Sequence, residues 1–165
     1  MADDPDGWSA WLDRHGAAMV LLARQWVADR ADAEDVVQEA FVRFWRARER
    51  AADPTAFLYA CVRRCASNQR RGLARRSRRE QAAARPEAAP MLAGPLECEE
   101  RRRALEAALI HLPPPQREVL VMRIWGGLTF PQIAQAVGVP VDTAASRYRY
   151  ALAGLRARLA EESLR

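Results

Sequence analysis

Residues 128–159 read LTFPQIAQAVGVPVDTAASRYRYALAGLRARL, a pattern that predicts two short helices joined by a tight turn. Thr129 and Gln132 have the spacing of a capping box at a helix start. Gly138 tolerates the left-handed conformation that ends many helices, and Asp142 can cap the helix that follows. Small or branched side chains are expected to pack around the turn: Ile133, Ala134, Val137, Val139 and Val141. Together these features predict a helix-turn-helix.

The second helix of this pair has two chemically different faces. Its apolar stripe should face inward and contains Ala145, Tyr148, Leu152, Leu155 and Leu159. The other side of its first turns carries Thr143, Ser146, Arg147 and Tyr150, with Arg149 at the flank. A recognition helix offers its N-terminal half to the major groove, where arginine can bind guanine through two hydrogen bonds. We therefore interpret this face as DNA-binding, because an ordinary solvated face does not explain why the polar residues gather in the first two turns.

The overall charge is consistent with a nucleic-acid partner. The chain has 165 residues and a net charge of +5, and all 26 basic residues are arginine. Arginine suits bidentate contacts with phosphates and guanine edges. A GC-rich genome would also replace lysine by arginine, so the positions of the charges carry more information than their number.

Several classes of protein are excluded by simple patterns. The acidic start MADDPDGW lacks the order of a secretion signal, and the apolar run GAAMVLLA is too short to span a membrane. We expect a cytoplasmic, nucleoid-associated protein without membrane insertion. The 3 cysteines include no CxxC pair. Cys61 and Cys65 lie one helical turn apart, but nothing nearby completes a four-ligand set, so we expect buried thiols and neither metal nor cofactor.

The first half of the sequence predicts amphipathic helices. Residues 8–29 space apolar groups as a helix does, and His15 lies on that stripe, where a core or boundary role fits better than a ligand role. A second helix should begin near Asp32, a candidate cap with Asp35 in a capping-box-like position. Its inward stripe comprises Val37, Ala40, Phe41, Phe44 and Trp45.

A third helix should follow a loop at 48–55 and start near Ala56. Leu58, Cys61, Val62 and Cys65 are expected to face inward, while the opposite face carries Tyr59, Arg63, Ser67 and Arg70. Positions 63–85 hold nine arginines and one acid, Glu80. The stretch 75–98 is rich in alanine, proline and arginine, has little periodicity, and reads as a flexible linker.

The second half is also helical. One helix from about Glu99 carries an apolar stripe and ends at the Pro113–Pro115 run, and Pro115 can open the next helix. No strand is predicted. The fold class is therefore all-α, with two small helical domains at 1–74 and 99–165 joined by the linker at 75–98.

Three stretches in this order resemble one family, the extracytoplasmic-function (ECF) group of bacterial RNA polymerase sigma factors in the sigma-70 superfamily. They are DAEDVVQEAFVRFW (32–45), AFLYACVRRCASNQRR (56–71) and LPPPQREVLVMRIWGGLTFPQIAQAVGVPVDTAASRYRYALAGLR (112–156). The resemblance covers most of the chain outside the termini and the linker. This sequence departs from the usual pattern at Phe57, Arg64 and Ala145, where the family often has tryptophan, asparagine and a basic residue.

The resemblance implies a role for each half. The first half is similar to sigma domain two, which docks on the clamp of the largest polymerase subunit and holds the minus-ten promoter element. Its implied docking residues are Asp35, Gln38, Glu39, Phe41 and Trp45, of which the last two also lie on the packing stripe. Its implied minus-ten residues are Tyr59, Arg63, Arg64, Arg70 and Arg71. Opening DNA requires aromatic or apolar groups for unstacked bases and arginines along the strand.

The second half is similar to sigma domain four, which reads the minus-thirty-five element as a duplex near the polymerase flap. Its implied contacts are Thr143, Ser146, Arg147, Arg149 and Tyr150. The resemblance further implies a non-catalytic protein, monomeric when free, whose partners are core RNA polymerase and promoter DNA. Members of this group are often held by an anti-sigma factor.

Two other functions fit the sequence less well. A repressor or activator using the helix-turn-helix alone would need a dimer interface to span two half-sites, and no leftover apolar face supplies one. A metal-dependent enzyme would use Asp32, Glu34, Asp35 and Glu39 with His15, but these acids spread around their helix instead of converging. The sequence therefore favours a promoter-specificity subunit.

Overall fold

A computed structural model describes residues 5–77 and 99–163, and the all-α prediction is confirmed. The predicted linker therefore lies outside the described residues from position 78 on. The described parts form seven α-helices and one 3₁₀ turn: α1 (Pro5–Ala23), α2 (Arg30–Ala47), η1 (Arg48–Arg50), α3 (Pro54–Ser77), α4 (Glu99–Ile110), α5 (Pro114–Ile124), α6 (Phe130–Val137) and α7 (Val141–Ser163).

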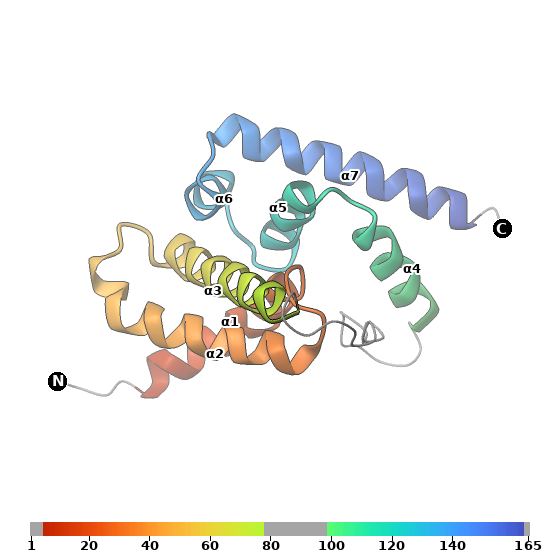
Figure 1. The fold of residues 1–165 in the computed structure, drawn as a ribbon. Coiled ribbons are helices and arrows are strands. Elements are labelled where there is room, and N and C mark those ends of the chain that lie inside the picture. The colour runs from red at the N-terminus through yellow and green to blue at the C-terminus, as the bar shows by residue number, and fades with distance from the viewer. Residues whose placement is uncertain (1–4, 78–98, 164–165) are drawn as a thin grey trace.

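The helices form two groups that pack on each other. We call α1–α3 the N-terminal half and α4–α7 the C-terminal half. In Figure 1 the long blue helix α7 lies at the top, the N-terminal half lies at the bottom, and α5 and α6 lie between them. Contacts between the halves come chiefly from α3 with α6 and from α1 with α5. The two halves thus share an interface along α3.

One hydrophobic core extends across that interface. Large side chains of the N-terminal half, such as Met19, Phe44 and Leu58, belong to the same buried cluster as Met122 and Ile133 of the C-terminal half. A second, smaller cluster lies among α4, α5 and α7 and comprises Ala108, Leu109, Leu112, Leu120, Ala151 and Leu155. Burial of apolar surface therefore stabilises both each half and their mutual packing.

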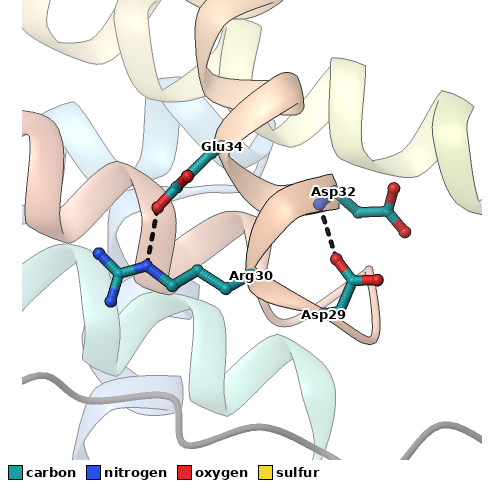
Figure 2. A network of polar contacts seen from close by, with 4 residues as sticks. All are labelled: Asp29, Arg30, Asp32 and Glu34. Carbon is teal, nitrogen blue, oxygen red and sulfur yellow. Dashed lines mark hydrogen bonds and ion pairs between the residues drawn. The ribbon is translucent and has the colours of Figure 1, made fainter.

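The start of α2 differs from the prediction. The N-cap is Asp29, which has an extended backbone conformation and whose Oδ1 accepts a hydrogen bond from the Asp32 amide at 2.7 Å, as Figure 2 shows. Arg30 donates to Glu34 one turn further along, at 2.7 Å. The expected cap Asp32 is wrong because it already lies inside the first turn. The first helix also ends at Ala23, short of residue 29, and residues 24–29 form the turn that supplies the true cap.

Two further helices begin one or two residues before the start that the sequence predicted. Asp53 Oδ1 accepts a hydrogen bond from the Ala56 amide at 2.9 Å, so α3 begins at Pro54, two residues before the predicted start. The short helix η1 occupies the first part of the predicted loop. Helix α5 begins at Pro114, which makes Pro115 its second residue. Both corrections place proline in a first turn, where its missing N–H has no intrahelical partner to lose.

The helix-turn-helix has the predicted capping. Thr129 and Gln132 exchange the two hydrogen bonds of a capping box, at 3.3 and 2.9 Å, and Gly138 adopts φ 73°, ψ 41°. Val139 packs on the core, whereas Val141 is exposed, against expectation. Asp142 was also expected to cap α7, but the helix already begins at Val141.

Candidate nucleic-acid interface

The first turns of α7 present the polar face that the sequence indicated. Arg149 and Tyr150 are exposed, Tyr150 to 67%, and Arg149 Nη2 donates to Ser146 Oγ at 3.1 Å. Thr143, Ser146 and Arg147 are half-buried. The inward side is rotated slightly from the predicted stripe, because Ala144, Ala151 and Leu155 are its buried members. The five residues thus lie together at one end of a long helix that is anchored on α5 and α6.

Helix α3 carries the second group of candidate contacts. Arg64, Arg70 and Arg71 are exposed. The Arg70 guanidinium lies 4.7 Å from the Trp26 ring centroid, and Arg71 donates to Asn68 at 2.9 Å. Arg63 is different, because its Nε donates to both carboxylate oxygens of Glu118 at 3.0 and 3.1 Å. Three of the four arginines therefore face solvent, and one is engaged by the C-terminal half.

Tyr59 does not lie on the outward face of α3, as the sequence predicted. Its side chain is fully buried, and its hydroxyl lies 3.1 Å from His15 Nδ1. Burial raises the pKa of Tyr59 and lowers the pKa of His15, and the nearby Arg14 charge adds to the lowering for His15. The prediction failed because α3 is covered on more than one side, by α1 and α2 and by the C-terminal half.

A hollow of about 360 Å³ opens beside these arginines. Its lining combines arginines with rings and small apolar groups: Trp26, Phe57, Ala60, Cys61, Arg63, Arg64, Ser67, Arg71 and Ala136. Flat, negatively charged groups suit such a lining, because bases stack on rings while guanidinium groups bind phosphates. Cys61 and Cys65 are buried, as expected, and burial raises the pKa of Cys61 to about 11. Both thiols therefore remain protonated at neutral pH. Trp26 and Phe57 are lining residues that the sequence reading had not assigned to this site.

The polar face of α2 gathers the candidate docking residues. Asp35, Gln38 and Glu39 line a shallow hollow of about 530 Å³ together with Val42, Arg43 and Arg46. Val42 is 41% exposed although it is apolar. The sequence analysis did not assign Val42, Arg43 and Arg46 to the docking surface. The signal that could have indicated this surface is Val42, an apolar residue that lies outside the packing stripe of its helix.

Two other docking candidates lie in the core side of α2. Phe41 is only 1% exposed, and its ring stands 4.4 Å from that of Trp8, edge to face. Trp45 is half-buried beside the same Trp8 ring, with the Arg48 guanidinium 3.7 Å from its centroid. Phe41 therefore stabilises the fold and is inaccessible to a partner in this structure, whereas Trp45 offers one edge.

Metal and membrane features are few in the part of the chain that the structure describes. No group of three or more His, Cys, Asp or Glu side chains within it could hold a metal ion. None of the helices within residues 5–77 and 99–163 is both long and apolar enough to cross a lipid bilayer.

The geometry defines a helical protein with a capped helix-turn-helix, two arginine-bearing faces and a separate polar surface on α2. Residues 11–76 match the family described as sigma-70 region 2, and residues 102–155 match sigma-70, region 4. The ECF RNA polymerase sigma factor SigL of Mycobacterium tuberculosis is 30% identical over an alignment of 158 residues that covers 92% of this chain and 88% of SigL. The RNA polymerase sigma-E factor of Streptomyces avermitilis is 31% identical over 89% of this chain and 82% of its own length.

Solved structures agree on the fold. The sigma factor RpoE of Bartonella quintana, solved with the anti-sigma factor NepR, gives a TM-score of 0.70 at 21% identity over 93% of this chain and 96% of its own. CnrH, solved with the cytosolic domain of CnrY, gives 0.65 at 23% identity over 96% and 91%. The chain belongs to the ECF RNA polymerase sigma factors. It acts in promoter recognition and transcription initiation, as the resemblance implied.

Proposed function

We propose that three surfaces divide the work of this sigma factor. The exposed face of α2 docks on the clamp of core RNA polymerase, the arginines of α3 hold the melted minus-ten strand, and the start of α7 reads the minus-thirty-five duplex near the flap. The observation that carries this proposal is the capped helix-turn-helix, which supports a basic helix whose first turns expose Arg149 and Tyr150. That is the geometry by which a recognition helix enters a major groove.

For the minus-ten surface, the exposed residues Arg64, Arg70 and Arg71 support the proposal, together with Arg63 once it is released from Glu118. The adjoining hollow offers Trp26 and Phe57 to an unstacked base. Tyr59 is left out, because its hydroxyl is buried against His15.

At the minus-thirty-five surface, Arg147 is suited to guanine, and Thr143 and Ser146 are suited to contacts with phosphates or bases.

For polymerase docking, the hollow on α2 supports Asp35, Gln38 and Glu39 as polar contacts around the exposed Val42. An apolar centre with a polar rim is the usual organisation of a protein interface. Trp45 can contribute its exposed edge, and Phe41 acts only through packing.

We further propose the organisation in which these surfaces act. Domains at 1–74 and 99–165, joined by the linker at 75–98, would let each half reach its own promoter element. The protein would be monomeric when free, cytoplasmic and nucleoid-associated, and would perform no chemistry of its own. We infer that an anti-sigma factor is its controlling partner, since the neighbour RpoE was solved with the anti-sigma factor NepR.

The docking surface is tested by the double substitution Asp35→Ala with Gln38→Ala. Both side chains are exposed, so the variant should fold normally while its binding to core polymerase falls by at least about tenfold, the loss of two polar contacts. Asp13→Ala, which removes an exposed carboxylate from α1, is the matched control. Equal binding by the double variant and the wild type, measured by competition for core polymerase, would contradict this assignment of α2.

A further inference from the structure

The hollow beside α3 exists because short side chains line it. One stripe along α3 contributes six of its lining residues: Phe57, Ala60, Cys61, Arg64, Ser67 and Arg71. Ala136 of α6 adds another small side chain to the lining. Alanine, cysteine and serine are too short to fill the space, which measures about 360 Å³. That volume lies at the lower end of the range for small-molecule sites, so it suits one small ligand.

The chemistry of the hollow changes along the α3 stripe. The first turns of the stripe offer the ring of Phe57 with the small apolar groups of Ala60 and Cys61. The later turns offer the guanidinium groups of Arg64 and Arg71 and the Ser67 hydroxyl. A ligand that matches this gradient has a flat apolar part and an anionic part.

Two of the three arginines in the lining are available to an anion. Arg63 is occupied by Glu118, to which its Nε donates at 3.0 and 3.1 Å. Arg64 and Arg71 are exposed, and neither forms an ion pair with a carboxylate among the described residues. Arg71 gives one hydrogen bond to Asn68 and keeps further N–H donors. Two guanidinium groups can bind two phosphate groups, each through paired hydrogen bonds.

Two aromatic rings of the lining are held in place from behind and keep exposed surface. The Trp26 ring centroid lies 4.7 Å from the Arg70 guanidinium and 5.9 Å from that of Arg63. Phe57 packs on Phe44 with 6.2 Å between the ring centroids. Trp26 and Phe57 are both only half-buried, so each retains area on which a flat heterocycle can stack.

We propose that this hollow binds a free purine nucleoside diphosphate. The base stacks against Trp26 and Phe57, and the two phosphates bind Arg64 and Arg71. A purine fits because its double ring has more stacking area than a pyrimidine. This site requires no DNA, so the binding step does not depend on the promoter contacts proposed above. One consequence does rest on the proposed function: the bound nucleotide competes with the minus-ten strand for Arg64 and Arg71.

Binding is measured by isothermal titration calorimetry of the full chain with GDP and with ADP. Pyrophosphate is the matched ligand, because it has the two phosphates without the base. We expect at least one nucleotide to bind with a dissociation constant below about 1 mM, and pyrophosphate to bind about tenfold more weakly, because it cannot stack. Failure of both nucleotides to bind, or pyrophosphate affinity equal to theirs, would overturn the proposal.

A steric variant tests the location without changing any charge. Ala60→Leu adds volume to the lining and should weaken nucleotide binding about tenfold or more, whereas Ala74→Leu, at an exposed position of the same helix outside the lining, should not. Circular dichroism checks that both variants fold. Equal affinities in two folded variants would overturn the location.

A charge variant gives an independent test of the same location. Arg71→Ala should weaken nucleotide binding about tenfold, because it removes charged hydrogen bonds to a phosphate. Arg76→Ala removes an exposed arginine of α3 outside the lining and should have little effect. Equal losses in both variants would show general charge attraction and overturn the site. This comparison decides if Ala60→Leu does not fold.

A further arm distinguishes a free nucleotide from a nucleotide within DNA. A labelled single-stranded oligonucleotide is titrated with the protein, and the nucleotide that binds in calorimetry should displace it. Oligonucleotide binding without any binding of GDP or ADP would assign the hollow to DNA alone and overturn the inference. Run-off transcription with core polymerase keeps the two proposals separate. A wild type that gives defined transcripts but binds no nucleotide contradicts only the inference, and one that binds a nucleotide but gives no transcripts contradicts only the proposed function.

Discussion

His15 shows how a single buried side chain links the stability of this fold to pH. It lies in the core beside Tyr59, and burial holds its pKa below the ordinary value of 6.5. The unfolded chain therefore binds a proton at a higher pH than the folded chain does. The contribution of neutral His15 to the free energy of unfolding is fully present above about pH 6.5. It falls as the pH drops from there toward the lower pKa of the folded state, by at most about 1.4 kcal/mol per pH unit.

The pH effect is measured by urea unfolding at about pH 7.5 and about pH 5.5, on either side of the ordinary histidine pKa. His15→Gln should lose less stability between the two conditions than the wild type. His111 is the other of the 2 histidines and is exposed, so His111→Gln should behave as the wild type does. An identical pH dependence in all three proteins would contradict this account of His15.

Arg147 tests the proposed reading of upstream DNA. Arg147→Ala should weaken the binding of polymerase holoenzyme to a promoter carrying the minus-thirty-five element by about 1–3 kcal/mol, if its contact is bidentate to guanine. Arg156→Ala, an exposed arginine further along α7, is the control for lost charge. Equal losses for both variants in a filter-binding titration would indicate only general attraction to the phosphate backbone.

At the scale of single residues, the sequence predicted side-chain chemistry better than surroundings. The buried roles of His15, Cys61 and Cys65 followed from a stripe of apolar neighbours on one helix. Tyr59 was misplaced, because periodicity on α3 identifies one inward face and cannot show that the C-terminal half covers another. The docking and DNA-contact roles stay predictions.

The helix ends provide a paired test of backbone conformation. Gly138 has φ 73°, where a Cβ is strained, so Gly138→Ala should cost about 1–2 kcal/mol. Gly16 lies within α1, and a Cβ there would meet nothing within 4 Å among the described residues, so Gly16→Ala should stabilise by about 0.5–1 kcal/mol. The free energy of unfolding in urea checks both signs. A stabilising Gly138→Ala would contradict the left-handed end of α6.

At the scale of elements, the sequence predicted a helix cap correctly where only one residue near the helix start could serve as the cap. Thr129 with Gln132 is the only capping-box pair at the start of α6, and that box formed as predicted. The start of α2 offers several aspartates, and periodicity could not choose between Asp29 and Asp32. Which aspartate caps α2 depends on the position at which the preceding turn ends, and that position is determined by the end of α1.

The shared core predicts that the two described halves unfold as one cooperative unit. Ile133 of α6 belongs to the cluster that also contains the core of α1–α3, so Ile133→Val should cost about 0.5–1.5 kcal/mol and raise amide exchange in α3 as well as in α6. Ile110→Val makes the same chemical change at a 51% exposed position of α4 and should have little effect. Faster exchange confined to α6 and α7 in mass spectrometry would show that the halves unfold independently.

At the scale of the molecule, no pattern in the sequence indicates how the two halves pack on each other. Arg63 and Glu118 stand 55 positions apart, and Asp53 and Gln132 stand 79 apart, so no helical periodicity relates them. The interface arises from three-dimensional fit around Gly126 and Tyr59. The family and the helical class were predicted correctly from local motifs, whereas this packing depends on contacts between residues far apart in the chain.

The most direct test of the central claim is run-off transcription with core RNA polymerase on a library of genomic promoter fragments. With the protein added, we predict defined transcripts from a subset of fragments that share a minus-thirty-five and a minus-ten element. Asp35→Ala with Gln38→Ala should abolish those transcripts, and core polymerase alone should give none. Transcription that is equally unselective with and without the protein, together with no association with core polymerase, would contradict the account.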